Sequence, residues 1–375
     1  MHRLIHFHTD HKFIHDTLKY NSELLENIIV FIGDADNAII NKLNNLKFEF
    51  YIFNESQVDN INNILPHYDG VVIYDLNNVN IQILERITRD KKVFLRLFGY
   101  ELYKLKLNKF VSRATLRLFK PISLESYSFK NYLKKKVKRL LGIEFSFNYF
   151  EQKLLYSKID AIILINKFEY QALQKYFYLP KFIQLPLTRE LPKNLELSNK
   201  SNKLIIGNSR NIWNNHLDVF RIIKKSKRFD NYKFNLFFNY GADNDYTEKV
   251  RNKANQNSFV LIEDFLDIQE FSRVYNTATA LIINSYRQHA LGNILTAISS
   301  GTKVYLNRRS STYKWLKHEG FYISEISELP RDIDNNKVRQ TQKEFQHNAN
   351  CYNQLKENYT QLDFIANVKA ILEQE

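Results

Sequence analysis

The chain has 375 residues, more than a single ordinary core encloses, and this length predicts two domains of about 150–200 residues each. Hydrophobic residues make up 44% and charged residues 25% of the chain, which excludes a wholly disordered protein. No apolar run approaches the roughly 18 residues of a membrane span, and the first residues are typical of a strand rather than of a signal peptide. The single cysteine, Cys351, excludes an internal disulfide framework, so we expect a cytoplasmic protein.

The chain is basic, with 54 Lys and Arg against 40 Asp and Glu and a formal net charge of +14. Such a balance favours anionic partners, namely nucleotides, nucleic acids or a membrane surface. Residues 104–141 hold twelve of the basic residues and a single acid, Glu125. Most of the excess charge is therefore concentrated in one short segment.

Short apolar runs alternate with helix-like segments in the first half. They predict strands over 4–8, 28–33, 48–53, 71–76, 93–99, 161–166 and 182–186. Helical patterns lie between several of them, for example over 58–65 and 81–87. Apolar strands separated by helices indicate a parallel sheet that is covered on both faces.

The second half repeats this alternation after a polar, proline-containing stretch that we interpret as a linker, with Pro186, Pro192 and residues 197–202. Strands are predicted over 204–207, 234–240, 259–262, 280–284 and 303–307. Helices are predicted over 215–225, 246–254, 268–277, 293–300 and 311–318.

These elements predict an α/β protein made of two Rossmann-like, doubly wound domains that face a cleft. The first domain is expected over residues 1–190, with an insertion at about 101–141, and the second over residues 201–335. Residues 336–375 are expected to form helices that pack back on the domains.

The insertion carries an amphipathic pattern. On a helical wheel Leu133, Val137, Leu140 and Leu141 share one narrow face, and cations occupy the remainder. This pattern is typical of a helix that lies in the interface of an anionic bilayer. A solvated basic helix that packs on the protein's own core is the alternative, and nucleic-acid binding is a third interpretation. The expected membrane-binding residues are Arg113, Arg117, Lys134, Lys135, Lys136, Lys138 and Arg139.

A first candidate phosphate-binding motif follows the strand over 204–207. Gly207, Asn208 and Ser209 form a small polar turn, and Asn215 and His216 open the next helix. Main-chain N–H groups and a helix dipole at such a position attract phosphate. An ordinary strand-to-helix turn is the alternative interpretation.

A second motif, residues 286–294, follows the strand over 280–284. Arg287 is a natural diphosphate ligand, because its guanidinium fork matches phosphate oxygens bidentately. Gly292 permits close backbone approach, and Gln288 and Asn293 can bind hydroxyls. A surface arginine is the alternative. Both motifs end predicted strands of one domain, so both are expected on the same rim.

These motifs resemble those of a known family. Residues 207–209, 214–216, 240–241, 287–292 and 306–308 occur in the order and approximate spacing of the 4-acetamido-4,6-dideoxygalactose (Fuc4NAc) transferase family of enterobacterial common antigen synthesis. The N-terminal half is similar more faintly, through residues 4–6, Asp10 and residues 99–103. The loop around Arg210 and Trp213 is bulkier than in the family, and Glu101 replaces the family's usual Asp, so the donor sugar stays open.

The resemblance implies a GT-B glycosyltransferase that is peripheral on the inner face of the bacterial cytoplasmic membrane. Its N-terminal domain would bind a polyprenyl-diphosphate-linked saccharide, and its C-terminal domain a dTDP- or UDP-sugar. The implied donor-binding residues are Gly207, Asn208, Ser209, Asn215, His216, Tyr240, Gly241, Arg287, Gln288, Leu291, Gly292, Asn293 and Arg308.

Catalysis in this scheme is expected to need no metal or other cofactor. Arg287, with Arg308 and the helix after Ser209, would stabilise the departing diphosphate. Asp10 and Glu101 are the candidate bases if the reaction inverts configuration, and helix capping or a surface ion pair is the alternative role for either. A non-catalytic nucleotide-sugar or glycan-binding protein of the same fold and, less favoured, a nucleic-acid-binding protein are the rival functions.

Two other kinds of pattern carry less information. His6 and His8 share a strand face, but the sequence offers no assured third metal ligand. Asp-x-Asp triplets at 34–36 and 243–245 are expected by chance in a chain so rich in Asn and Asp.

Overall fold

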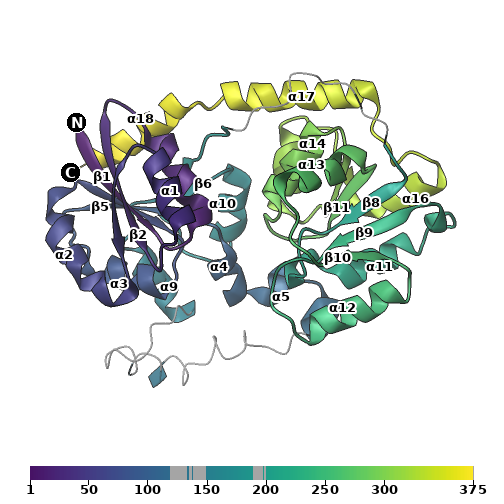
Figure 1. Ribbon diagram of the computed structural model, residues 1–375, viewed down its shortest axis with the longest axis horizontal. Coiled ribbons are helices and arrows are strands. Elements are labelled where there is room, and N and C mark those ends of the chain that lie inside the picture. The colour runs from purple at the N-terminus through teal and green to yellow at the C-terminus, as the bar shows by residue number, and fades with distance from the viewer. Residues whose placement is uncertain (119–132, 135–136, 138–148, 189–196, 198–199, 375) are drawn as a thin grey trace. The chain divides into compact units, whose positions relative to one another are not determined.

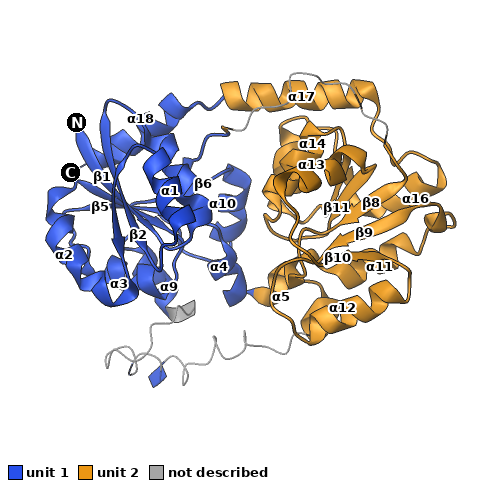
Figure 2. Ribbon diagram, in the orientation of Figure 1, with its two compact units in different colours: residues 1–106, 122–187, 358–375 blue, residues 107–121, 188–357 orange. Residues whose placement is uncertain are grey.

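The structure is a computed structural model that describes residues 1–118, 133–134, 137, 149–188, 197 and 200–374. The chain forms two compact units (Figure 2). Unit 1 comprises residues 1–106, 122–187 and 358–375, and unit 2 comprises residues 107–121 and 188–357. No helix among the described residues has both the length and the apolar content that crossing a bilayer requires.

Unit 1 is built on a seven-stranded parallel sheet in the order β3-β2-β1-β4-β5-β6-β7 (Figure 1). Its strands are buried apolar runs, as expected for a sheet covered on both faces. The strands are β1 (His2–His8), β2 (Leu25–Ile32), β3 (Glu49–Phe53), β4 (Gly70–Tyr74), β5 (Lys92–Arg96), β6 (Ala161–Leu164) and β7 (Lys181–Gln184).

Short polar side chains cap the start of helices that follow strands in unit 1. Asp36 accepts from the Ile39 N–H at 2.8 Å, and Asn77 accepts from the Asn80 N–H at 2.9 Å. The α-helices of the unit are α1 (Asn37–Asn45), α2 (Ile61–Ile64), α3 (Asn78–Arg86), α4 (Tyr100–Leu105), α9 (Tyr149–Tyr156), α10 (Lys167–Gln174) and α18 (Gln361–Leu372), with 3-10 helices η1 (His11–Tyr20), η2 (Glu55–Asn60) and η3 (Leu65–His67).

Unit 2 is built on a six-stranded parallel sheet in the order β10-β9-β8-β11-β12-β13. The strands are β8 (Lys203–Ile206), β9 (Lys233–Phe237), β10 (Val260–Ile262), β11 (Ala280–Ile283), β12 (Lys303–Leu306) and β13 (Ser324–Glu325). The predicted doubly wound α/β architecture is confirmed in both units. Each predicted strand is present, whereas the two-residue β13 was not predicted.

The helices of unit 2 cover both faces of its sheet, with α13 and α14 on one face and α11 and α12 on the other (Figure 1). They are α5 (Leu107–Phe110), α6 (Arg113–Leu118), α11 (His216–Ile223), α12 (Asp245–Asn255), α13 (Ile268–Thr277), α14 (Leu291–Ser299), α15 (Ser311–His318), α16 (Leu329–Asp334) and α17 (Gln342–Glu357). Short 3-10 helices are η4 (Ile212–Asn214), η5 (Phe229–Asn231) and η6 (Ile326–Glu328).

The C-terminal segment is helical, as predicted, and its two helices belong to different units. Helix α17 is part of unit 2, whereas α18 is part of unit 1. Phe364 and Val368 of α18 are fully buried and join a core cluster with Leu4 and Phe94 of unit 1. The last helix therefore completes the core of the unit that begins the chain.

The expected insertion is divided differently from the prediction, because its residues 107–118 belong to unit 2 rather than to the first domain. The Ser112 N–H donates to Asn215 Oδ1 at 2.8 Å, and Thr115 is hydrogen-bonded to Tyr246. These buried bonds fasten α6 to the start of α11 and α12. Of the predicted interfacial helix, Leu133, Lys134 and Val137 are described and exposed. The positions outside the described residues are Lys135, Lys136, Lys138, Arg139, Leu140 and Leu141.

We expect Asn215→Ala to lower the free energy of unfolding by about 2–4 kcal/mol, because two buried main-chain groups lose their partner. Besides accepting from Ser112, Asn215 donates from Nδ2 to the Asn284 carbonyl at 2.8 Å. Urea denaturation measures the change. Asn255→Ala, on the exposed side of α12, is the control and should stay within about 0.5 kcal/mol of wild type. Equal effects of the two variants would contradict the structural role of Asn215.

Candidate functional site

The two predicted phosphate-binding motifs meet at one place in unit 2. Strands β8 and β11 are neighbours in the centre of the sheet, and the chain winds outward from them in opposite directions. In open parallel sheets, ligands bind outside the carboxyl ends of the strands at such a switch point. The loop over 207–215 leaves β8 there, and the loop over 284–290 leaves β11.

Gly207 ends β8 in a conformation that only glycine accommodates. Its φ is +69°, and a Cβ would lie 2.8 Å from Nε2 of His216 and 3.2 Å from Cγ of Asn214. His216 is fully buried, and its Nδ1 is hydrogen-bonded to the Tyr246 hydroxyl at 2.9 Å. Burial lowers the pKa of His216 to about 3, so this imidazole is neutral at physiological pH.

The polar residues after Gly207 differ in whether their side-chain atoms have hydrogen-bond partners. Asn208 donates from Nδ2 to the Tyr240 hydroxyl at 2.9 Å, while among the described residues no donor reaches its buried Oδ1. Ser209 is fully buried, and its carbonyl accepts from Asn214 at 3.0 Å. Asn215 uses its side chain for Ser112 and Asn284. These hydrogen bonds hold the turn in place. The buried Oδ1 of Asn208, an acceptor with no partner among the described residues, marks a position for a ligand or water.

Arg287 lies over the first loop. Its guanidinium carbon is 4.8 Å from the centre of the Trp213 ring, and its Nη2 is 3.4 Å from Nδ1 of His289. Burial, and then the Arg287 charge, hold the pKa of His289 well below its usual value. The structure thus brings Arg287 against the loop that follows Gly207, and the charge there belongs to the arginine rather than to the histidines.

Helix α14 begins at the same rim. Its N-cap, Ala290, has a φ of +57° and provides no side-chain cap. A Cβ at Gly292 would meet nothing within 4 Å, so there is open space beside the first turn of the helix at this position. Main-chain N–H groups at an open helix start carry partial positive charge. Leu291 and Gln288 flank this turn, and Asn293 donates to the Tyr275 hydroxyl at 2.8 Å.

The remaining donor-binding candidates have no direct contact with Arg287 among the interactions described for them. Tyr240 is half exposed and is joined to the site through Asn208. Gly241 has a φ of +116°, and a Cβ there would lie 2.8 Å from Cγ of Arg210, so it shapes the neighbouring loop. The side chain of Arg308 is 74% exposed and pairs with Glu325 at 3.5 Å. Arg308 is therefore engaged in a surface ion pair.

The candidate bases lie in unit 1. Asp10 follows β1 and caps η1 by accepting from the Lys12 N–H at 2.9 Å. Glu101 lies in the first turn of α4 and is buried. Burial, and then the Glu101 carboxylate, raise the pKa of the Tyr156 hydroxyl well above its usual value. Asp10 is thus partly open to solvent, whereas Glu101 belongs to the interior of the unit.

Asp75 is a carboxylate that the sequence reasoning missed. It directly follows β4, the strand next to β1, and its φ is +67°. Its Oδ1 accepts from the Asn77 N–H at 3.1 Å and from Asn80 Nδ2 at 3.2 Å. Burial, followed by the charge of Asp10, raises the pKa of Asp75 to about 6, against the opposing effect of these hydrogen bonds and of Lys104. The predicted strand over 71–76 includes position 75, whereas β4 ends at Tyr74, so the sequence contained no sign that this acid follows the strand.

His6 and His8 of β1 are hydrogen-bonded to neighbouring side chains of unit 1. Nε2 of His6 is hydrogen-bonded to Asn27 Oδ1, and Nε2 of His8 to Thr17 Oγ1, each at 2.9 Å. Within the described part of the chain, no three His, Cys, Asp or Glu side chains are grouped so that they could hold a metal ion.

No family model and no curated protein matches this sequence. Solved structures do match it in fold. The Anabaena protein Alr3699/HepE, in complex with UDP and glucose, is similar with a TM-score of 0.62 and 11% identity over 99% of both chains. The E. coli trehalose-6-phosphate protein bound to UDP-2-fluoro glucose has a TM-score of 0.59 and 8% identity over 100% of this chain and 99% of that one.

The lipopolysaccharide outer core galactosyltransferase WaaB, in its apo form, has a TM-score of 0.56 and 10% identity over 99% of both chains. The two parallel sheets, of seven and six strands, correspond over the full length to these proteins. The fold is GT-B. At these identities the likeness establishes the fold alone.

We expect Asp75→Asn to stabilise the protein at pH 8 by about 1–3 kcal/mol and to have little effect at pH 4. The folded-state pKa, about 6, lies above the usual value of 3.8. The folded protein therefore holds the proton more tightly than the unfolded chain, and its stability falls as the pH rises from about 4 to 6. Asparagine removes this penalty and is tolerated at positive φ.

Urea denaturation of both proteins at the two pH values measures the difference. Asp34→Asn, an exposed position of the same unit, is the control and should stay within about 0.5 kcal/mol throughout. A stabilisation by Asp75→Asn that is the same at pH 4 and pH 8 would show that the half-buried carboxylate is not its cause.

Proposed function

We propose that this protein is a glycosyltransferase. It moves a deoxyamino sugar similar to Fuc4NAc, or a related hexose, from a dTDP- or UDP-sugar to a polyprenyl-diphosphate-linked saccharide in bacterial surface polysaccharide synthesis. The observation that carries the proposal is the meeting of Arg287 with the loop after Gly207 at the switch point of unit 2. Two proteins of the same fold hold UDP or a UDP-sugar analogue, which supports a nucleotide-sugar donor.

In this proposal unit 2 binds the donor. The diphosphate lies against the open first turn of α14, and the guanidinium of Arg287 neutralises the negative charge that grows on it as the glycosidic bond breaks. Trp213 holds the guanidinium in place by stacking. Asn208 offers a hydrogen-bond acceptor to a hydroxyl or ring N–H of the donor. This arrangement would stabilise the leaving group without a metal ion.

Unit 1 would bind the acceptor in this proposal, with Asp75 as its base. The acceptor hydroxyl gives its proton to the Asp75 carboxylate, its oxygen bonds to the anomeric carbon, and the bond to the nucleoside diphosphate breaks. A base with a pKa near the working pH performs such a step well. Burial and Asp10 together place the pKa of Asp75 there. The candidates from the sequence, Asp10 and the buried Glu101, lie in the same unit and are the alternatives.

A lipid-linked acceptor places the enzyme at the inner face of the cytoplasmic membrane. We propose that the basic segment of residues 104–141 contributes to this association through its cations. Arg113, Arg117 and Lys134 are exposed, as this role requires.

UDP or dTDP at a concentration 100 times its Kd is expected to raise the free energy of unfolding by about 2.7 kcal/mol, which thermal denaturation detects as a higher Tm. Arg287→Lys retains the charge but loses the bidentate fork, and we expect it to weaken nucleotide binding about 10- to 100-fold. Titration calorimetry measures the affinity directly.

Arg308→Lys is the matched control, because Arg308 is exposed and paired with Glu325. It should change the affinity less than about twofold. If no nucleotide at millimolar concentration shifts the Tm, or if both lysine variants bind equally well, the assignment of the donor site is wrong.

The rate of sugar transfer is expected to fall as the pH drops through about 6, where Asp75 gains a proton. Asp10→Asn should move this acidic limb to lower pH, because the Asp10 charge raises the pKa of Asp75. Lys104→Gln should move it the opposite way, since Lys104 lowers that pKa. Asp75→Asn should abolish turnover while leaving nucleotide affinity unchanged.

The pH profile of kcat/KM for the three variants measures these effects. An unchanged limb in Asp10→Asn and full activity in Asp75→Asn would exclude Asp75 as the base and leave Asp10 or Glu101.

A further inference from the structure

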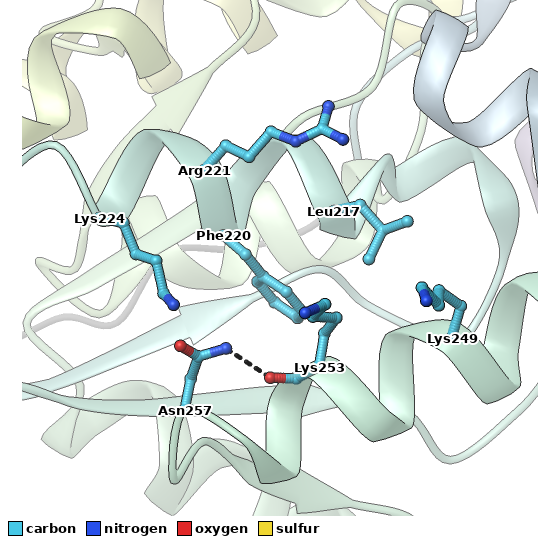
Figure 3. A pocket seen from close by; sticks show the side chains of 7 residues that line it. All are labelled: Leu217, Phe220, Arg221, Lys224, Lys249, Lys253 and Asn257. Carbon is cyan, nitrogen blue, oxygen red and sulfur yellow. Dashed lines mark hydrogen bonds between the residues drawn. The ribbon is translucent and has the colours of Figure 1, made fainter.

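Helices α11 and α12 of unit 2 form the walls of an open groove of about 270 Å³ (Figure 3). Arg221 lines it from α11 and Lys224 from the residue that caps the end of α11, and Lys249 and Lys253 line it from α12. We call it the basic groove, because these four cations line it and no carboxylate does. The site around Arg287 uses none of these residues.

The charges of the basic groove are largely uncompensated. Arg221 pairs with Asp218 at 3.3 Å, but across the described ranges no carboxylate lies within ion-pair distance of Lys224, Lys249 or Lys253. By contrast, Arg251, which also lies in α12, forms an ion pair with Glu263 at 2.8 Å. The groove therefore keeps a net positive charge that an anionic partner can neutralise.

The floor of the groove is apolar. Leu217 is half-buried there, and Phe220 is buried against Phe259, with ring centres 5.1 Å apart. Cations above an apolar floor suit the interfacial region of a membrane, where phosphate groups lie next to hydrocarbon. The volume is below the roughly 300–1,000 Å³ of a small-molecule pocket, so the groove suits a single headgroup better than a nucleotide sugar.

A second hollow of the protein shows what distinguishes the basic groove. It lies in unit 1, has about 380 Å³, and is lined by Arg86 and Lys91 among others. There Arg86 pairs with Asp59 at 2.6 Å and Lys91 with Asp90 at 3.3 Å. Its cations are thus matched by acids, and charge complementarity points to no anionic partner.

Helix α6 extends the positive surface beside the groove. It packs against both α11 and α12, and its Arg113 and Arg117 are exposed. Right-handed crossovers place α11 and α12 on one face of the sheet and α14 and α15 on the other. The unpaired cations of these helices therefore belong to the α11–α12 face of unit 2.

We infer that the basic groove, together with Arg113 and Arg117, docks unit 2 on an anionic phospholipid surface, with a headgroup phosphate between α11 and α12. The inference rests on the proposed function only in taking a membrane as the partner. It adds the cations of the groove to those of the basic segment, to which Arg113 and Arg117 belong, and it requires no bound nucleotide.

The test is co-sedimentation of the full chain with phosphatidylglycerol–phosphatidylcholine vesicles, and with vesicles of phosphatidylcholine alone. Lys249→Gln with Lys253→Gln should weaken binding to the anionic vesicles about 25-fold, since each cation near such a surface contributes about fivefold. Lys314→Gln with Lys317→Gln, two exposed lysines of α15, is the matched control and should change binding less than about twofold.

Two further measurements distinguish the membrane contact of the groove from the donor site and from the contact made by the basic segment. The UDP or dTDP shift in Tm should be the same in both double variants, so a failed donor site and a failed membrane site give different results. Reversing the charges of Lys134, Lys135 and Lys136 should weaken vesicle binding independently of the groove variant. Equal loss in the α12 and α15 variants, no preference for anionic vesicles, or groove-dependent binding of duplex RNA instead of vesicles would each overturn the inference.

Discussion

The contact between Gly207 and the ring of His216 fixes the candidate donor site. The ring occupies the space that a Cβ at position 207 would need, with 2.8 Å between the two positions. This contact requires a glycine at the end of β8, draws the start of α11 against that strand, and sets the path of the loop between them. Trp213, which holds Arg287, lies in that loop. The position of the guanidinium therefore depends on the absence of a side chain six residues before Trp213.

The electrostatics of the site follow from burial. His216 and His289 are both held neutral, because the protein interior disfavours their charged forms. A neutral imidazole can pack beside a guanidinium without repelling it, whereas an imidazolium would compete for the same anion. The positive charge of the candidate site consequently comes from an arginine that does not titrate, and it is constant across the physiological range of pH.

Much of the fold could be predicted from the sequence, because the buried strands are short apolar runs that end at glycine or polar residues. The two motifs of unit 2 were also placed correctly on the strand ends, although the role of each side chain could not be foreseen. The motif predicts Asn215 as a donor-binding residue, whereas in the structure its buried side chain accepts from Ser112, 103 positions away at the start of α6. Asp75 shows the opposite case, since its raised pKa arises from burial and from Asp10, and neither the burial nor this proximity is visible in a linear pattern.

The assignment of α18 to unit 1 has a consequence for biosynthesis. Phe364, Ile365, Val368 and Ile371 fill a core whose other members include Leu4, Val72 and Phe94. A ribosome releases the first strands long before the final helix, so the nascent first unit waits with part of its apolar interior uncovered while unit 2 is synthesised. Chaperone dependence should accordingly concentrate on this unit, and a nonsense codon near position 358 should yield an insoluble product even though almost the whole sequence has been translated.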